Sequence, residues 1–246
     1  MPFTAAHPSV FLPLFRSKKV SATALVAGSM APDFEYFLKM DTGSEHSHTI
    51  AGLFYFGLPV TFILSLIFHR IIRKPLMANL PAAIRDKCSF DPDFDFTAFL
   101  RKRYLTFIWC ALLAIGSHIL WDWFTHNGWF ARNLDIYSVI SLRVGELNYP
   151  LFFILQQLST AAGCFAIGIY IMALPPVHRN KAWGRGMWWY WPLIIIITGS
   201  VSFVRIGIPD LESQHGEIII TLIAGFLAGM VVTSIIEGKT GKTIKN

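Results

Sequence analysis

The chain has 246 residues, of which 54% are hydrophobic and 15% are charged, and its mean hydropathy is +0.50. This composition excludes an ordinary soluble globular domain, because so little charge cannot cover the surface of a protein of this length. The net charge of +6 is compatible with a nucleic-acid partner, but the basic residues gather in loops between apolar runs. We therefore expect a membrane protein whose partners are lipids and not nucleic acid.

The first 49 residues predict a short helical hairpin. Its two apolar stretches, 10–15 and 20–31, are each too short to span a bilayer, and the basic segment 16–19 separates them. Such a hairpin could be re-entrant or lie at the membrane interface, and a single broken span is the alternative.

Five later segments predict membrane-spanning helices. Four of them approach or exceed the roughly 20 residues that cross about 30 Å of hydrocarbon: 50–72, 104–124, 151–174 and 218–236. The fifth, 188–204, is shorter but very apolar, with an aromatic end. We therefore expect an all-α, polytopic membrane protein with about five transmembrane helices plus the N-terminal hairpin. We expect one membrane domain over 1–246, with outer-face motifs in 1–49, a core helix pair in 50–126 and three further spans in 127–246.

The distribution of Lys and Arg predicts the orientation of these spans. Most basic residues fall in the loop 70–103, in the loop 179–185 and in the tail after residue 237. The positive-inside rule places these segments, and so the C-terminus, in the cytoplasm. The start of the first span and the end of the second then share the non-cytoplasmic face.

His118 and Asp122 are the most informative pair in the chain. They stand four residues apart at the end of the apolar run 104–124, a spacing that places both on one face of a helix, one turn apart. Ionisable side chains at the edge of a hydrocarbon-length segment are costly unless something compensates them, and a metal ion would do so. The predicted topology allows five further candidate ligands to reach the same face: His7, Asp33, His46, His48 and His126.

Each candidate also has a structural interpretation. Asp33 could simply cap a short helix, and His126 could favour the dipole at a helix end. For His46 alone the structural interpretation is favoured. The convergence of several such residues on one face, in a chain with only 8 histidines, favours a metal site. Imidazole and carboxylate ligands suit zinc, and also manganese or iron.

Four motifs carry a family resemblance: MPFTAAHP at 1–8, GSMAPDFE at 28–35, SHT at 47–49 and HILWDWFTH at 118–126. Together they resemble an uncharacterised bacterial membrane-protein family, domain of unknown function 4184. The resemblance covers most of the chain and is strongest before residue 149. That family is similar to inner-membrane metal-dependent hydrolases and, more distantly, to the zinc-dependent phospholipase C and single-strand nuclease superfamily. The resemblance implies helices with a phospholipase C-like metal site in a bacterial inner membrane.

The resemblance also implies a ligand set. One zinc ion would be held by four residues: Asp33, His48, His118 and Asp122. His7 would contribute to a second ion with Asp122 bridging, and His126 would belong to a third. The helix expected to complete the third ion reads LQQLST at 155–160, without His or Glu, and one of its glutamines, Gln156 or Gln157, could substitute only weakly. We therefore expect one or two zinc ions, or another divalent metal.

These inferences predict a metal-dependent hydrolase of a phosphoester, with a lipid phosphate as the expected substrate. Asp33 and Asp122 are the candidate catalytic residues, although we favour a ligand role for Asp33. Arg132 and Arg143 follow the site in the outer loop, and either could pair with a substrate phosphate. One alternative is a non-catalytic protein with a structural metal. Another is a metal or proton transporter, which the position of the ionisable residues near helix ends disfavours.

Overall fold

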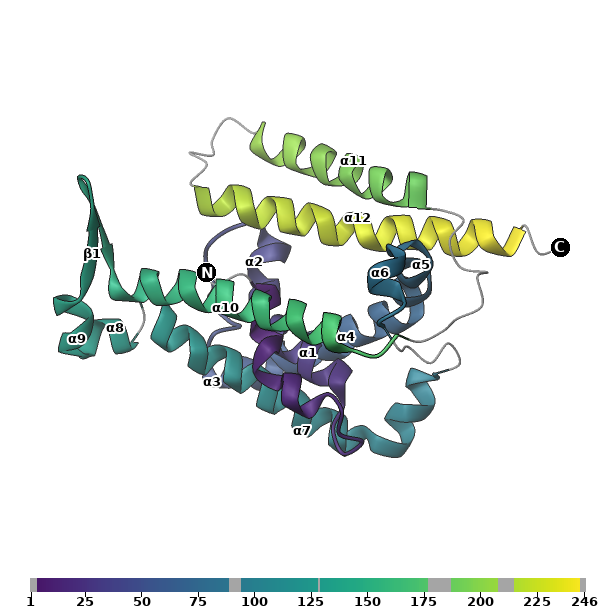
Figure 1. Cartoon of the computed structure of the whole chain (residues 1–246), viewed down its shortest axis with the longest axis horizontal. Coiled ribbons are helices and arrows are strands. Elements are labelled where there is room, and N and C mark those ends of the chain that lie inside the picture. The colour runs from purple at the N-terminus through teal and green to yellow at the C-terminus, as the bar shows by residue number, and fades with distance from the viewer. Residues whose placement is uncertain (1–3, 89–93, 128, 177–186, 208–214, 244–246) are drawn as a thin grey trace. The chain divides into compact units, whose positions relative to one another are not determined.

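The computed structural model describes residues 4–88, 94–127, 129–176, 187–207 and 215–243, most of them helical (Figure 1). The chain divides into two compact units. Unit 1 comprises Met1–Asp33, His46–Phe62 and Leu100–Ala173, and unit 2 comprises Phe34–Glu45, Ile63–Phe99 and Leu174–Asn246. All the predicted metal ligands belong to unit 1. The assignment of one domain to 1–246 stays a prediction.

The N-terminal helical hairpin is present in unit 1. Its first arm is the 3-10 helix η1 (Thr4–Leu14), in which Pro8 and Pro13 lack the amide protons that a regular α-helix needs. Its second arm is α1 (Ala22–Met30), which the Ser21 side chain caps by accepting from the Ala24 amide. The arms pack against each other, and the short 3-10 turn η2 (Ala31–Asp33) continues the second arm.

The first predicted span is a continuous helix made of five pieces. α3 (Ile50–Gly52) starts behind a Thr49 cap and leads into the π-helical turn η3 (Leu53–Gly57). α4 (Leu58–Ile67), a second π-helical turn η4 (Phe68–Ile72) and α5 (Arg73–Asn79) complete it. Such π turns occur mostly singly inside α-helices and are frequent at functional sites. Here the first of them begins four residues after Thr49, next to the His46–His48 motif.

The second span is α7 (Phe96–Thr125), which bends at Arg103, where φ is −137° and ψ is 30°. The straight part therefore begins at residue 104, as the sequence predicts. α1 packs closely on it at Gly28, where a Cβ would lie 2.9 Å from the Ala111 carbonyl oxygen and 3.0 Å from the Ala114 Cβ. A small apolar core lies between this helix and the first span: Ala31, Ile115 and Ile119 with Leu53, Leu58 and Val60.

The connection to the third span contains a feature that the all-α prediction lacks. Two short helices, α8 (Trp129–Asn133) and α9 (Asp135–Val139), lead into an antiparallel hairpin of β1 (Ser141–Val144) and β2 (Leu147–Pro150). The reversal is a two-residue loop in which Gly145 has φ +61°, the left-handed conformation that such loops require. α10 (Leu151–Ala173) follows directly.

Unit 2 contains α2 (Phe34–Lys39), α6 (Ala82–Arg85), α11 (Met187–Ile206) and α12 (His215–Thr243). α11 and α12 pack through a small-residue seam, because a Cβ at Gly225 or Gly229 would lie about 3 Å from a carbonyl oxygen of α11. The buried Tyr190 hydroxyl lies 2.9 Å from the Ser234 hydroxyl across this seam.

Four helical stretches among the described residues are long and apolar enough to cross a membrane: Ile50–Asn79, Phe96–Asn133, Leu151–Ala173 and Gly216–Lys239. They coincide with four of the predicted spans, of which the third ends one residue earlier than predicted, so the all-α, polytopic prediction is confirmed. The fifth prediction, 188–204, falls on the 20-residue helix α11, which is not among these four. The predicted basic loop 179–185 lies outside the described residues.

Candidate metal centre

The candidate ligands come from separate segments of unit 1. η1 carries His7, η2 ends on Asp33, and the turn before α3 carries His48. The last two turns of α7 carry His118 and Asp122 on one face, and His126 follows the end of that helix. The structure brings all six side chains together.

Four of these residues form a compact group: Asp33, His48, His118 and Asp122 each offer one ligand atom, and these atoms lie within 4.8 Å of one another. The His118 Nε2 atom lies 3.4 Å from Asp33 Oδ1 and 3.2 Å from Asp122 Oδ2. The His48 Nε2 atom lies 3.7 Å and 3.2 Å from the same two oxygens. Ligand atoms that surround one ion tetrahedrally at about 2.1 Å are about 3.4 Å apart, so the four fit the donor set of a transition metal.

Asp122 divides its two oxygens between two pairs of histidines. While Oδ2 faces His48 and His118, Oδ1 lies 3.8 Å from His7 Nε2 and 3.5 Å from His126 Nδ1. This arrangement suits a carboxylate that bridges two ions. The resemblance assigned His126 to a third ion, whereas in the structure it lies next to the same oxygen as His7.

The centre is buried. Asp33 is 1% exposed and His118 is not exposed at all. Among the described residues, His7 Nε2, His118 Nε2 and Asp122 Oδ1 have no hydrogen-bond partner. Buried polar atoms without partners cost about 1–3 kcal/mol each, and a cation bound between these atoms would remove that cost.

A second layer of contacts orients the ligands. The His118 Nδ1 atom lies 2.6 Å from the Ser29 carbonyl oxygen, to which it can only donate, so the neutral form of this imidazole has its lone pair on Nε2, facing the centre. The Thr4 hydroxyl donates to Asp33 Oδ2 at 2.5 Å and leaves Oδ1 for the centre. The sequence analysis missed Thr4 and Ser29, because it searched only for residue types that bind metals. Both positions lie inside the motifs at 1–8 and 28–35 that carry the family resemblance, which was the one available signal.

The charges of the groups outside the spans favour cation binding. Burial acts to raise the pKa of Asp33, but the adjacent His118 outweighs it and, with His48, holds the pKa of this carboxyl well below its usual range. The pKa of His48 is raised, because contacts with the Asp122 and Asp33 carboxylates outweigh its burial. An ionised Asp33 is the form that binds metals, and an ion would compete with a proton for His48.

His46 lies outside the centre. Its imidazole is exposed and sits 3.1 Å from the Tyr55 hydroxyl, as the structural interpretation favoured from the sequence implies. Its carbonyl oxygen accepts from the Thr49 hydroxyl at 3.0 Å, and a Cβ at Gly52 would lie 1.8 Å from that oxygen. The backbone of residue 46 therefore helps to fix the turn that presents His48.

The structural interpretation of Asp33 as a helix cap does not hold, because its side chain is engaged with Thr4 and the imidazoles. The other predicted residues lie further out. Gln156 is buried and Gln157 is exposed on α10, so only the former is enclosed by unit 1. Arg132 and Arg143 are both exposed.

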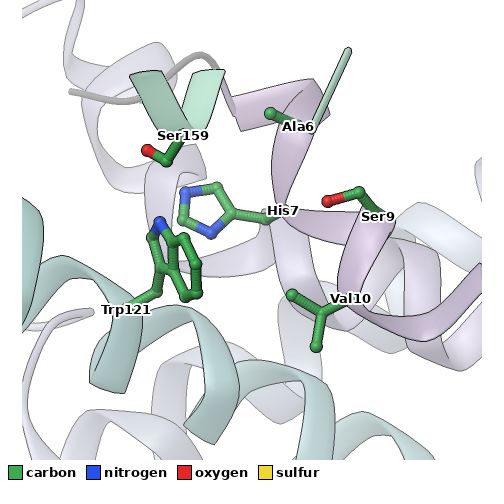
Figure 2. Close-up of a pocket in the computed structure, with 6 residues that line it drawn as sticks. All are labelled: Ala6, His7, Ser9, Val10, Trp121 and Ser159. Atoms are coloured by element: carbon green, nitrogen blue, oxygen red, sulfur yellow. The ribbon is translucent and has the colours of Figure 1, made fainter. Parts of the chain in front are cut away.

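A small pocket of about 20 Å³, enough for about one water molecule and partly open to the surroundings, lies beside His7. Figure 2 shows the His7 ring next to the Trp121 indole, with the Ser159 hydroxyl nearby. The lining residues come from η1, α7 and α10: Ala6, His7, Ser9, Val10, Trp121 and Ser159. Because His7 Nε2 is 3.8 Å from Asp122 Oδ1, this pocket ends next to the centre.

The family model described as Domain of unknown function (DUF4184) matches residues 1–235. The chain belongs to this family. The match confirms the resemblance carried by the four motifs, and it covers every candidate ligand of this DUF4184 protein. No curated protein and no solved structure matches the chain.

Proposed function

We propose that this DUF4184 protein is a metal-dependent hydrolase of a phosphoester, and of a lipid phosphate in particular, embedded in the bacterial inner membrane. Its site would face the non-cytoplasmic side, and its C-terminus would be cytoplasmic. The observation that carries the proposal is a buried Asp/His group with a pocket beside it. A catalytic metal site keeps a position open for water or substrate, whereas a structural site is closed by protein ligands.

The donor set fits zinc, in one or two ions. A first ion would be held by the group of four: Asp33, His48, His118 and Asp122. A second would use Asp122 Oδ1 with His7 and His126. When bound, such an ion lowers the pKa of water from 15.7 towards about 7 and stabilises charge on phosphoryl oxygens.

The two carboxylates would then have different roles. Asp33 is buried with Oδ2 engaged by Thr4 and Oδ1 facing the imidazoles, which suits a ligand. With only the first ion bound, Asp122 Oδ1 faces His7, one of the residues that line the pocket, and would be placed to orient or deprotonate a water molecule there; with a second ion bound it would be a ligand instead. Arg132 or Arg143 would hold the substrate phosphate from outside.

Metal analysis of the purified full-length protein tests the site. We expect near-stoichiometric zinc in the wild type and its loss in His118→Ala and Asp122→Asn. The matched control is His46→Ala, which removes an exposed imidazole two residues from His48 and should retain the metal. Carefully purified wild-type protein without any transition metal would refute the metal centre.

An activity panel tests the reaction. We expect the zinc-loaded protein to hydrolyse a phospholipid or a phosphomonoester, and Asp122→Asn to abolish that activity. Metal retention without hydrolysis across the panel would support the structural alternative. Zinc or proton flux into vesicles that contain the protein would support the transporter.

A further inference from the structure

The N-terminal hairpin connects two opposite ends of unit 1. At one end it supplies the metal centre: the His7 ring stacks on His118 with centroids 3.8 Å apart, and Ser29 bonds the same imidazole. At the other end, two contacts hold the tip of the hairpin. The Arg103 guanidinium donates to the Lys18 carbonyl oxygen at 2.6 Å, and the Phe15 ring meets Tyr170 edge-on with centroids 6.0 Å apart.

Between these two ends, successive residues of the second arm contact successive residues of α7. The Ser21 amide donates to Cys110 Sγ at 3.3 Å, Gly28 packs on Ala111 and Ala114, and Ser29 reaches His118. α1 therefore runs parallel to α7 from the tip to the metal centre. Figure 1 shows the hairpin turning back near the bend of α7.

The first arm, η1, contacts α10 in the same sequential manner. On α10, Gly163 packs against Ala6 and Ser9 of η1. Seven residues further along α10, Tyr170 lies beside Phe15. η1 thus runs parallel to α10, from the metal centre towards the C-terminal end of that helix. Both arms place the tip at the same end of unit 1, where α7 begins and α10 ends.

The distance between the two ends matches a bilayer. Arg103 and Asp122 are 19 residues apart on α7, which at 1.5 Å per residue is about 28 Å, close to the ~30 Å of a hydrocarbon core. Residues 4–15 and 20–32 contain no Lys, Arg, Asp or Glu, so both arms suit that core. The charged residues of the hairpin are confined to its tip, 16–19.

We propose that the hairpin enters the bilayer from the metal-site face and crosses the hydrocarbon, so that its tip lies in the opposite headgroup layer. There it completes a binding surface for the phosphates of anionic phospholipids. The surface consists of six exposed basic residues: Arg16, Lys18, Lys19, Arg101, Lys102 and Arg103. Positive side chains at this depth bind anionic headgroups. The count of basic residues alone assigns 16–19 to the non-cytoplasmic side, together with the other residues of 1–49. The contacts with Arg103 and Tyr170 instead assign them to the face opposite the metal centre.

Thiol labelling with a membrane-impermeant maleimide on sealed vesicles of either orientation tests the path of the hairpin. The native Cys88 reports the side of loop 70–103, and the other variants carry Cys88→Ser to remove it. Ser17→Cys reports the tip, and Glu146→Cys, in the exposed turn between β1 and β2, reports the metal-site face. We expect Ser17→Cys to react from the side of Cys88 and Glu146→Cys from the other. Reaction of Ser17→Cys from the Glu146 side, or from neither side, would overturn the proposal, and the result is independent of any metal or activity.

Lipid titration tests the binding surface. Phosphatidylglycerol is added to the detergent-solubilised full-length protein and the thermal unfolding midpoint is followed, with phosphatidylcholine as the neutral lipid. We expect only phosphatidylglycerol to raise the midpoint. The double variant Lys18→Gln/Lys19→Gln should weaken its apparent affinity on the order of tenfold, while Lys18→Arg/Lys19→Arg keeps it.

The matched control is the charge-conserving variant Lys18→Arg/Lys19→Arg, which changes the same two exposed positions but keeps their charge. Equal effects of the two lipids on the wild type, or equal losses of affinity in the Gln and Arg variants, would show that the charge of the tip does not recognise anionic headgroups.

Discussion

At the scale of single residues, Asp33 shows how one carboxylate is prepared for a metal. One oxygen accepts from the Thr4 hydroxyl, and the other faces His118 and His48. Thr4 and Asp33 are both buried, so the hydrogen bond is protected from water and holds the carboxylate in one orientation. Residue types alone pointed to Asp33 as a ligand, but the partner of its second oxygen is 29 residues away, in the motif at 1–8, and nothing in the sequence shows that the two residues meet.

Thr4→Val tests this positioning role, because it keeps the shape of the side chain and removes the hydroxyl. We expect zinc affinity to fall about 10- to 100-fold, the usual loss when a partner of a ligand is removed. Competition with a chromophoric chelator measures it. Thr4→Ser, which restores the hydroxyl, should recover most of the affinity, and a wild-type affinity in Thr4→Val would contradict the role.

At the scale of elements, the turn 46–49 decides where His48 points. The Thr49 side chain caps α3 by accepting from the Gly52 amide at 2.8 Å, and it also donates to the His46 carbonyl oxygen. Gly52 lies so close to that carbonyl that no other residue fits. The sequence predicts the start of the span here, yet only the folded turn shows why a glycine occupies its third residue.

Gly52→Ala should therefore displace the turn and His48 with it. The new Cβ would be 1.8 Å from the His46 carbonyl oxygen, which only backbone movement can relieve. We expect loss of zinc and a lower thermal unfolding midpoint, measured by metal analysis and by thermal denaturation. Gly116→Ala is the control: on α7 its Cβ would meet Leu53 Cδ1 at 3.8 Å, an ordinary contact, and the substitution should retain zinc. Similar zinc content in the two variants would contradict this account.

At the scale of the molecule, the metal centre joins the three chain segments that form unit 1. His7 and Asp33 come from the first, His48 from the second, and His118 and Asp122 from the third. An ion that binds only the folded arrangement stabilises it by an amount that grows with the logarithm of the free ion concentration relative to the dissociation constant. The buried polar atoms of the centre, which are costly alone, become part of the stability of the unit when an ion binds.

Removal of the metal should therefore destabilise the wild-type protein. A free ion concentration 100 times the dissociation constant contributes about 2.7 kcal/mol, so an excess of chelator should lower the thermal unfolding midpoint clearly. In His118→Ala the same chelator should have no effect, because the centre is already lost. A chelator that leaves the wild-type midpoint unchanged would indicate that no ion contributes to the fold.

The sequence by itself determined what depends on neighbours along the chain. Apolar runs of sufficient length defined the spans, and the four-residue spacing of His118 and Asp122 placed them on one helical face, because helix periodicity is local. The tertiary structure decided what depends on distant contacts. It split the two oxygens of Asp122 between two pairs of histidines and paired Asp33 with Thr4. It also placed the hairpin tip, residues 16–19, beside the start of the straight part of α7 and the C-terminal end of α10, because contacts with Arg103 and Tyr170 fix its position while its charge alone does not.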